Sequence, residues 1–376
     1  MNFEFSPDQV QLKDEARKLL SDQCPSSTVR KLLDEGAPMH RALWATLGEL
    51  GFLGAAIPQA YGGTGAGYLE LCVLAEELGR AIAPIPFSSS ICLGAELILA
   101  AASEDQKLKY LPRLASGASI ACVALSEGLG RIAPNAVTTT ARGDRLTGVK
   151  WPVQDGDVAD LAIVPARSGD TISLYLVELN APGVTRKVLQ SIDPTRSQAR
   201  IEFSDTPAQL LAADGWPTLV TALDRAAVLT AFEQVGGAQR AIEMGREYAL
   251  ERYAFGRPIG SFQAIKHKLV DMYVSTVLAR SNCYYGAWAL TNDARQLPEA
   301  AASARVSASQ AFFQCAKENI QIHGGMGFTW DLDCHLYYRR ANLLAVNLGG
   351  VTQWSDRLVE QLRDRRAEQE GASHGL

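Results

Sequence analysis

The hydrophobic pattern changes period twice along the chain, and this order of segments constrains the fold more than any single motif. From residue 6 to about residue 119 apolar residues recur at helical spacing, beginning with "SPDQVQLKDEARKLL", in which Ser6 can cap a helix that starts at Pro7. Short β-rich runs separated by Gly- and Asp-containing turns follow. After Trp216 the pattern is helical again, in long pieces. The sequence therefore predicts a helical part, a β part and a second helical part in series.

These changes of pattern predict an α+β fold that is mostly α. We expect an N-terminal helical domain over residues 1–119, a small antiparallel β domain over 120–215 and a C-terminal four-helix bundle over 216–368. The polar residues 369–376 are predicted to form a frayed tail. A chain of 376 residues is long enough for two or three such units.

Composition argues against several classes of partner. The net charge of -5 includes no segregated basic block, so neither nucleic acid nor a membrane surface is an expected partner. The N-terminus lacks the layout of an export signal, and no apolar run reaches membrane-spanning length. The seven cysteines show no C-x-x-C spacing and the five histidines do not pair at ligand spacing, which predicts neither disulfides nor a metal site. We expect a cytoplasmic protein.

The segment "ERYAFGRPIGSFQAIKH" interrupts two helical stretches and predicts a helix junction. Gly256 and Pro258 can end one helix, and Ser261 can cap the next helix, which is expected to begin around Phe262. One interpretation is a plain helix–helix turn. The other is an anion site, because a guanidinium and an amide beside a helix N-terminus suit a diphosphate.

A second glycine-containing segment, "QIHGGMGF", ends a later helix. Its paired glycines, Gly324 and Gly325, can cap that helix and let the backbone approach a flat ligand closely.

Together these segments resemble a known family. "ERYAFGRPIGSFQAIKHKLVDM" and "QIHGGMGFTWDLDCHLYYRRA", separated by one helix, resemble the two C-terminal signatures of the flavin-dependent acyl-CoA dehydrogenase family. "IPQAYGGTGAGYLE" resembles a third stretch, in the N-terminal helical domain of that family. The resemblance covers nearly the whole chain and implies an oligomeric oxidoreductase that uses FAD to desaturate an acyl-CoA thioester between Cα and Cβ. It also implies an electron-transfer-flavoprotein-like acceptor and a place in lipid or steroid catabolism.

The same resemblance assigns roles to individual residues. One group would grip the diphosphate and adenosine half of an FAD held mainly by the neighbouring subunit. We call this group the clamp; it consists of Arg252, Phe255, Gln263, Gln321, Gly324 and Gly325. On the flavin-ring side Ser126 keeps a hydroxyl and Gln154 stands where the family has a threonine that bonds the flavin. Ile132 and Pro152, in contrast, depart from the family pattern there.

The catalytic base is missing from both positions where the family carries it. Removing an α proton needs a carboxylate in a dry pocket, where desolvation raises the pKa. The aligned residues are Gly349 and Ala226. Glu233 is a weak substitute: it follows Ala226 by seven residues, on almost the same helix face but roughly 10 Å along the axis. The alternative for Glu233 is a buried structural carboxylate paired with an arginine.

Three interpretations of the whole chain remain open. The first is a non-catalytic partner subunit of a heteromeric acyl-CoA dehydrogenase, which keeps the clamp and has lost the base. The second is an active homo-oligomer with an unconventional base. The third is a flavin-free structural or interaction protein, for which retention of the clamp would be unexpected. The small residues Gly349 and Ala226 predict an enlarged cavity, suited to a bulky thioester such as a steroid side chain.

Overall fold

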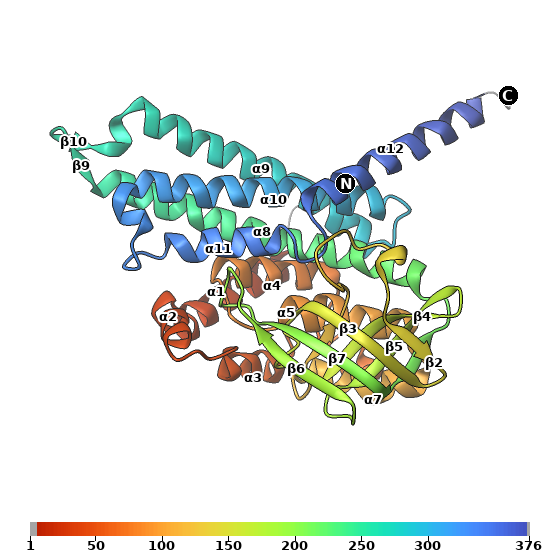
Figure 1. The fold of residues 1–376 in the computed structure, drawn as a ribbon. Coiled ribbons are helices and arrows are strands. Elements are labelled where there is room, and N and C mark those ends of the chain that lie inside the picture. Colours follow the sequence, from red (N-terminus) through yellow and green to blue (C-terminus); the bar gives the residue numbers. More distant parts are fainter. Residues whose placement is uncertain (1–5, 374–376) are drawn as a thin grey trace.

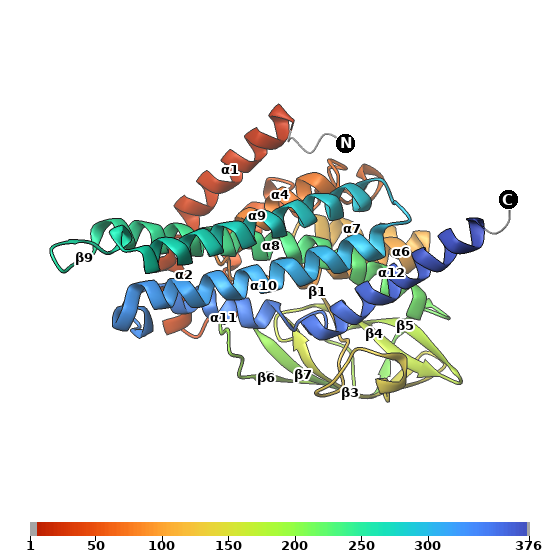
Figure 2. The same cartoon turned by 90° about the horizontal axis from the view of Figure 1, so that it is seen from above.

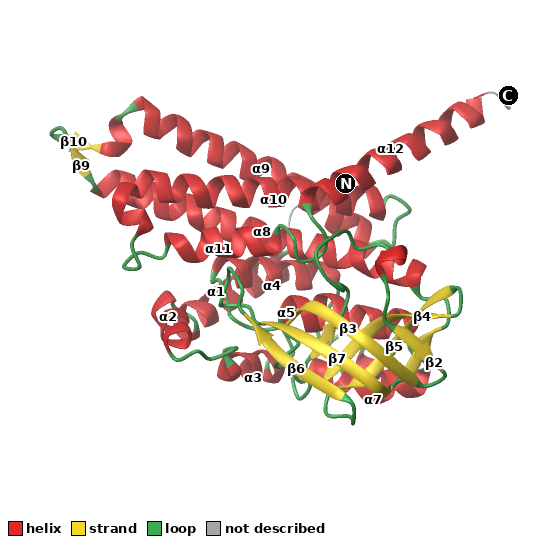
Figure 3. Cartoon of the chain, viewed as in Figure 1, coloured by secondary structure: helices red, strands yellow, loops and turns green. Residues whose placement is uncertain are grey.

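The computed structural model describes residues 6–373 and confirms the predicted fold class, with helices at both ends of the chain and a sheet between them (Figures 1 and 3). Within the described residues no helix is both long and apolar enough to cross a membrane. The N-terminal part contains α1 (Pro7–Gln23), α2 (Ser26–Asp34), α3 (Arg41–Glu49), η1 (Gln59–Tyr61), α4 (Tyr68–Arg80), α5 (Phe87–Ser89), η2 (Ser90–Ala95), α6 (Glu96–Ala101) and α7 (Glu104–Ala115).

The start of α1 follows the sequence prediction. The Ser6 hydroxyl accepts a hydrogen bond from the Gln9 backbone N–H, and the Gln9 side chain accepts one from the Ser6 backbone N–H. This reciprocal capping satisfies two N–H groups that would otherwise lack partners at the first turn of the helix.

The β part forms one mostly antiparallel sheet, in the order β6-β7-β3-β2-β4-β5-β8. Its strands are β1 (Ala121–Val123), β2 (Thr140–Arg142), β3 (Arg145–Gln154), β4 (Leu161–Ser168), β5 (Thr171–Glu178), β6 (Val184–Leu189), β7 (Gln198–Pro207) and β8 (Gln209–Ala212); a short helix η3 (Pro134–Ala136) precedes β2. Strand β1 pairs in parallel with β4. Sequence patterning missed β6 and β8, because β6 is an exposed edge strand without alternating burial and β8 has only four residues.

The C-terminal part contains three long helices that lie side by side, α8 (Trp216–Glu251), α9 (Gln263–Thr291) and α10 (Leu297–His323) (Figures 1 and 2). The shorter α11 (Cys334–Leu344) lies along them, and α12 (Val351–Ser373) extends away from them (Figures 1 and 2). A hairpin of β9 (Tyr253–Ala254) and β10 (Arg257–Pro258), followed by η4 (Ile259–Ser261), joins α8 to α9 and projects from one end of the bundle, away from the sheet (Figure 1).

Helix α10 is followed by η5 (Gly324–Phe328). Helix α12 continues to Ser373, into the segment predicted to fray, and the last three residues of that segment, 374–376, lie outside the described part of the chain.

Helices α4 and α8 touch backbone to backbone, and this contact joins the two helical parts. A Cβ atom added at Gly79 would lie 1.9 Å from the Glu233 carbonyl oxygen, and one added at Gly236 would lie 1.9 Å from the Glu76 carbonyl oxygen. Only glycine fits at such a separation. The backbone of Glu233 is thereby packed directly against α4.

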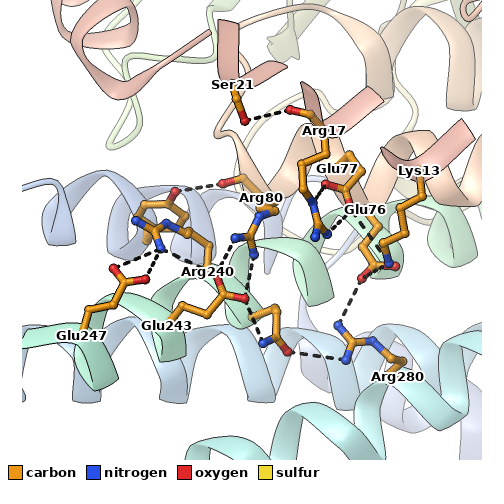
Figure 4. A network of polar contacts seen from close by, with 12 residues as sticks. Lys13, Arg17, Ser21, Glu76, Glu77, Arg80, Arg240, Glu243, Glu247 and Arg280 are labelled. Atoms are coloured by element: carbon orange, nitrogen blue, oxygen red, sulfur yellow. Dashed lines mark hydrogen bonds and ion pairs between the residues drawn. The ribbon is translucent and has the colours of Figure 1, made fainter. Parts of the chain in front are cut away.

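A network of charged side chains surrounds this contact on the side of α1 (Figure 4). Arg17 of α1 makes a two-bond ion pair with Glu77 of α4, at 2.9 and 2.7 Å. Arg280 of α9 reaches Glu76 of α4 at 3.1 Å, and Arg80 at the end of α4 pairs with Glu243 of α8. These pairs tie α1, α4, α8 and α9 together.

Gly79→Ala should destabilise the protein strongly, because the added methyl group forces α4 and α8 apart. We expect a loss of several kcal/mol in the free energy of unfolding, which falls in the range of an overpacked core. Gly350→Ala is the matched control, since a Cβ atom at Gly350 meets no atom within 4 Å. Thermal or urea unfolding measures both, and equal stability of the two variants would contradict the backbone contact.

Candidate functional site

A cavity of about 420 Å³ lies where the N-terminal helices, the sheet and the C-terminal end of α11 meet. Its walls come from segments far apart in the sequence: the α5–η2 region, β1 and the loop after it, β3, the ends of β6 and β7, and the segment after α11. The lining residues are Ser88, Ser89, Leu93, Val123, Leu125, Ser126, Leu129, Trp151, Pro152, Gln154, Leu189, Gln190, Ser191, Gln198, Leu343, Val346, Asn347 and Leu348.

The wall of this cavity has no acid and no base. Among the described residues that line it, the polar side chains are Ser, Gln, Asn and Trp, and none is Asp, Glu, His, Lys, Arg, Cys or Tyr. General base catalysis needs a titratable group within hydrogen-bond reach of the proton that it removes. The cavity can therefore bind and orient a ligand, but its lining has no side chain that can accept an α proton at neutral pH.

Neither of the two usual base positions can supply the missing group. Gly349 directly follows the lining residue Leu348, and its φ of 95° is one that side-chain-bearing residues rarely adopt. Ala226 is buried on α8.

Glu233 lies in a buried ion cluster and is absent from the cavity lining. Its Oε1 accepts from Arg196 Nη2 at 2.6 Å and from Arg340 Nη1 at 3.0 Å, and all three side chains are at most 3% exposed. Arg340 also pairs with Asp193 at 2.5 Å. Its Oε1 is therefore occupied by two guanidiniums, and the carboxylate is not presented to a ligand in the cavity. This geometry supports the structural alternative for Glu233.

Glu127, in the loop after β1, is fixed as an ionised anchor. Its carboxylate accepts from Lys150 Nζ at 2.6 Å and from the backbone N–H groups of Thr138 and Thr139. Burial raises the pKa of Glu127, but Lys150 and the hydrogen bonds outweigh burial and lower the pKa to about 2. Ser126, the neighbouring residue predicted to bind flavin, lines the cavity.

Gln154 also lines the cavity, but both ends of its amide are engaged by the protein. Its Oε1 accepts from Asn347 at 3.2 Å, and its Nε2 donates to Ser88 and Asp155, each at 3.3 Å. Asn347 is held in turn by Arg305 at 2.9 Å. The donor that a flavin ring would need at this position is therefore turned toward the cavity wall.

The clamp residues lie elsewhere, at the end of the bundle marked by β9 and β10 (Figure 1). The side chains of Arg252, Gln263 and Gln321 are exposed, and Phe255 is 97% exposed. The two clamp segments share this end of the bundle, because Tyr248 near the end of α8 stacks on His323 at the end of α10 with ring centroids 4.2 Å apart.

The two clamp glycines have open space around them, since a Cβ atom at Gly324 or Gly325 would meet nothing within 4 Å. Such open backbone can be approached closely by a ligand.

One local prediction about this junction is wrong. Ser261 does not cap α9, because its hydroxyl donates to the Pro258 carbonyl, and the N-cap residue is Phe262, which makes no side-chain cap. The first N–H groups of α9 therefore have no side-chain cap.

Comparison with known proteins shows the family. Residues 6–118 match the acyl-CoA dehydrogenase N-terminal domain, and residues 213–362 match the acyl-CoA dehydrogenase C-terminal domain. The chain is 34% identical to acyl-CoA dehydrogenase IpdE2 of Mycobacterium tuberculosis, over 88% of this chain and 90% of that protein. The chain therefore belongs to the acyl-CoA dehydrogenase family, whose members are oxidoreductases.

Two solved structures resemble the chain along almost its whole length. The ChsE4-ChsE5 complex from Mycobacterium tuberculosis has a TM-score of 0.87 and 28% identity, covering 96% of this chain and 99% of the matched one. A variant of the Tcur3481-Tcur3483 steroid ACAD has a TM-score of 0.87 and 29% identity, with the same coverage of both chains.

Sequence reasoning missed several buried charged residues, which bond to the cavity lining or belong to the ion cluster around Glu233. The most important are Arg196, Arg305, Arg340 and Asp155. A signal was present for Arg305, because this arginine interrupts the small-residue stretch "AAASARVSASQ", much as Glu233 interrupts an apolar one. The loop residues Arg196 and Asp155 had no such signal, since charged residues in loops are usually exposed.

Glu233→Gln should act mainly on stability. The change leaves Arg196 and Arg340 with less negative charge around them, and breaking a buried ion pair costs about 3–5 kcal/mol. Glu247→Gln, in an exposed pair with Arg240, should cost less than about 1 kcal/mol. Chemical denaturation compares the two, and an unchanged free energy of unfolding for Glu233→Gln would argue against the structural role.

Proposed function

We propose that this chain is a non-catalytic subunit of a heteromeric acyl-CoA dehydrogenase, in which a second family member carries the base and most of the flavin contacts. The observation that carries the proposal is the cavity wall without any titratable side chain. It combines with an exposed clamp at the β9–β10 end of the bundle, where this chain can hold a cofactor that belongs to a neighbour.

The residues of this chain fit an FAD that is shared with a neighbouring subunit better than an FAD that this chain binds alone. Arg252, with its exposed guanidinium, is suited to a diphosphate, and Phe255 offers an exposed aromatic face for an adenine. On the ring side Gln154 is bonded within the protein and Ile132 has no polar group, so this chain offers little to a flavin of its own. The FAD supplies the hydride acceptor of the family reaction, whereas the role of this chain is to hold and orient it.

The relatives support both the assembly and the substrate class of the proposal. One similar structure is named as the ChsE4-ChsE5 complex, and another as a variant of the Tcur3481-Tcur3483 steroid ACAD. We infer an acyl-CoA thioester with a bulky acyl group as the substrate of the assembly, an electron-transfer-flavoprotein-like acceptor for the electrons, and the cytoplasm as the location.

Co-expression with candidate neighbouring dehydrogenase subunits tests the assembly. The lone chain should be colourless, whereas the co-purified complex should hold half-stoichiometric FAD and oxidise acyl-CoA. Native mass spectrometry and the visible flavin band measure both quantities. A lone homo-oligomer with a full complement of FAD and with turnover would instead establish the active homo-oligomer.

Arg252→Ala should weaken FAD binding in the complex by about tenfold to a hundredfold, the usual effect of losing a hydrogen bond to a charged group. Folding and assembly should be unaffected, because Arg252 is exposed. Arg142→Ala, which removes an exposed arginine from β2, is the control and should leave FAD binding unchanged. FAD titration of the apo complex measures the affinity; equal affinities for the two variants would remove Arg252 from the clamp.

A further inference from the structure

The inner end of the cavity carries two adjacent serines. Ser88 and Ser89 belong to α5, line the cavity and are each only 6% exposed. Other lining residues mark the open side, since Leu129 is 93% and Val346 61% exposed. A ligand that enters between Leu129 and Val346 would therefore meet the serines with its far end.

The Ser88 hydroxyl is set up to donate a hydrogen bond. Its oxygen accepts from Gln154 Nε2 at 3.3 Å and from Arg196 Nη1 at 3.2 Å. Because these two bonds use both lone pairs of the oxygen, the Ser88 hydroxyl can form a further hydrogen bond only by donating its proton. No acceptor for that proton is found among residues 6–373, and a guanidinium that donates to the oxygen strengthens the O–H as a donor.

The Ser89 hydroxyl, in contrast, can accept a hydrogen bond from a ligand. It donates its proton to Asp155 Oδ2 at 2.6 Å, with the Pro86 carbonyl as a longer second acceptor at 3.1 Å. Its lone pairs remain available to accept a bond from the cavity. Asp155 is 2% exposed and has a φ of 56°, so both its backbone and its surroundings fix the carboxylate beside Ser89.

We propose that this serine pair selects an apolar acyl group that carries a hydroxyl at the end remote from the thioester. One ligand hydroxyl accepts from Ser88 and donates to Ser89, which satisfies both serines. That the ligand is an acyl-CoA thioester rests on the proposed function. The serine pair adds the class of acyl group that the cavity of this chain binds.

Other ligand ends fit the pair less well. An unsubstituted alkyl end would leave the Ser88 proton and the free lone pair of Ser89 buried without a partner, which is costly. A ketone can accept from Ser88 but has no proton for Ser89. A carboxylate end would come close to Asp155 in a cavity whose wall has no cation among the described residues.

Calorimetric binding of matched thioesters tests the proposal. The probes are an ω-hydroxyacyl-CoA and the unsubstituted acyl-CoA of the same chain length, titrated into the full-length chain without an electron acceptor. The hydroxylated probe should bind on the order of tenfold more tightly, the usual value of such hydrogen bonds. Ser88→Ala and Ser89→Ala should each remove this preference. Ser191→Ala, which changes a serine elsewhere in the same lining, should retain it.

Equal affinity of the two probes, or no binding of either, would overturn the proposal, as would a preference retained in both alanine variants. These outcomes are independent of the FAD stoichiometry that decides whether the chain works as a partner subunit, so the two proposals fail separately.

Discussion

The buried ion cluster around Glu233 is the interaction on which the rest of the structure depends. Two arginines, Arg196 and Arg340, balance two carboxylates, Glu233 and Asp193, in a region that is almost inaccessible to solvent. The four residues come from α8, α11 and the loop before β7, and the arginines also donate to carbonyls of the segment between α4 and α5. Such clusters add little net stability compared with an apolar core. They do restrict how the helices and loops that carry the charged residues can pack against one another.

Hydrogen bonds connect this cluster and the nearby Arg305 to the cavity lining. Arg196 extends from the cluster to Ser88, and Arg305 fixes Asn347 and through it Gln154. Burial lowers the pKa of Arg305 to about 9, which still leaves it charged at neutral pH. Arg196 and Arg305 thus fix residues of the cavity wall by hydrogen bonds, although the side chains that line the cavity are themselves uncharged. This division explains how the chain keeps a shaped cavity whose lining, among the described residues, includes no side chain that could remove a proton.

Much of the fold could be read from the sequence, but the site could be read only in part. The order of helices, strands and helices followed from hydrophobic periods, and the two glycine-containing segments indicated the residues that are proposed as the clamp. The exposed strand β6 carries no alternation, so no periodic signal could reveal it. The roles of Ser88, Ser89 and Asp155 depend on partners more than 60 residues apart, as in the Ser89–Asp155 bond, and no local pattern encodes such pairings.

A structure of the co-purified complex with FAD bound tests the proposal that this chain binds a neighbour's FAD and leaves its own cavity to an acyl group. We expect FAD diphosphate density against Arg252 of this chain, with the flavin ring inside the neighbouring subunit. A flavin ring seated beside Gln154 in the cavity of this chain would overturn the proposal.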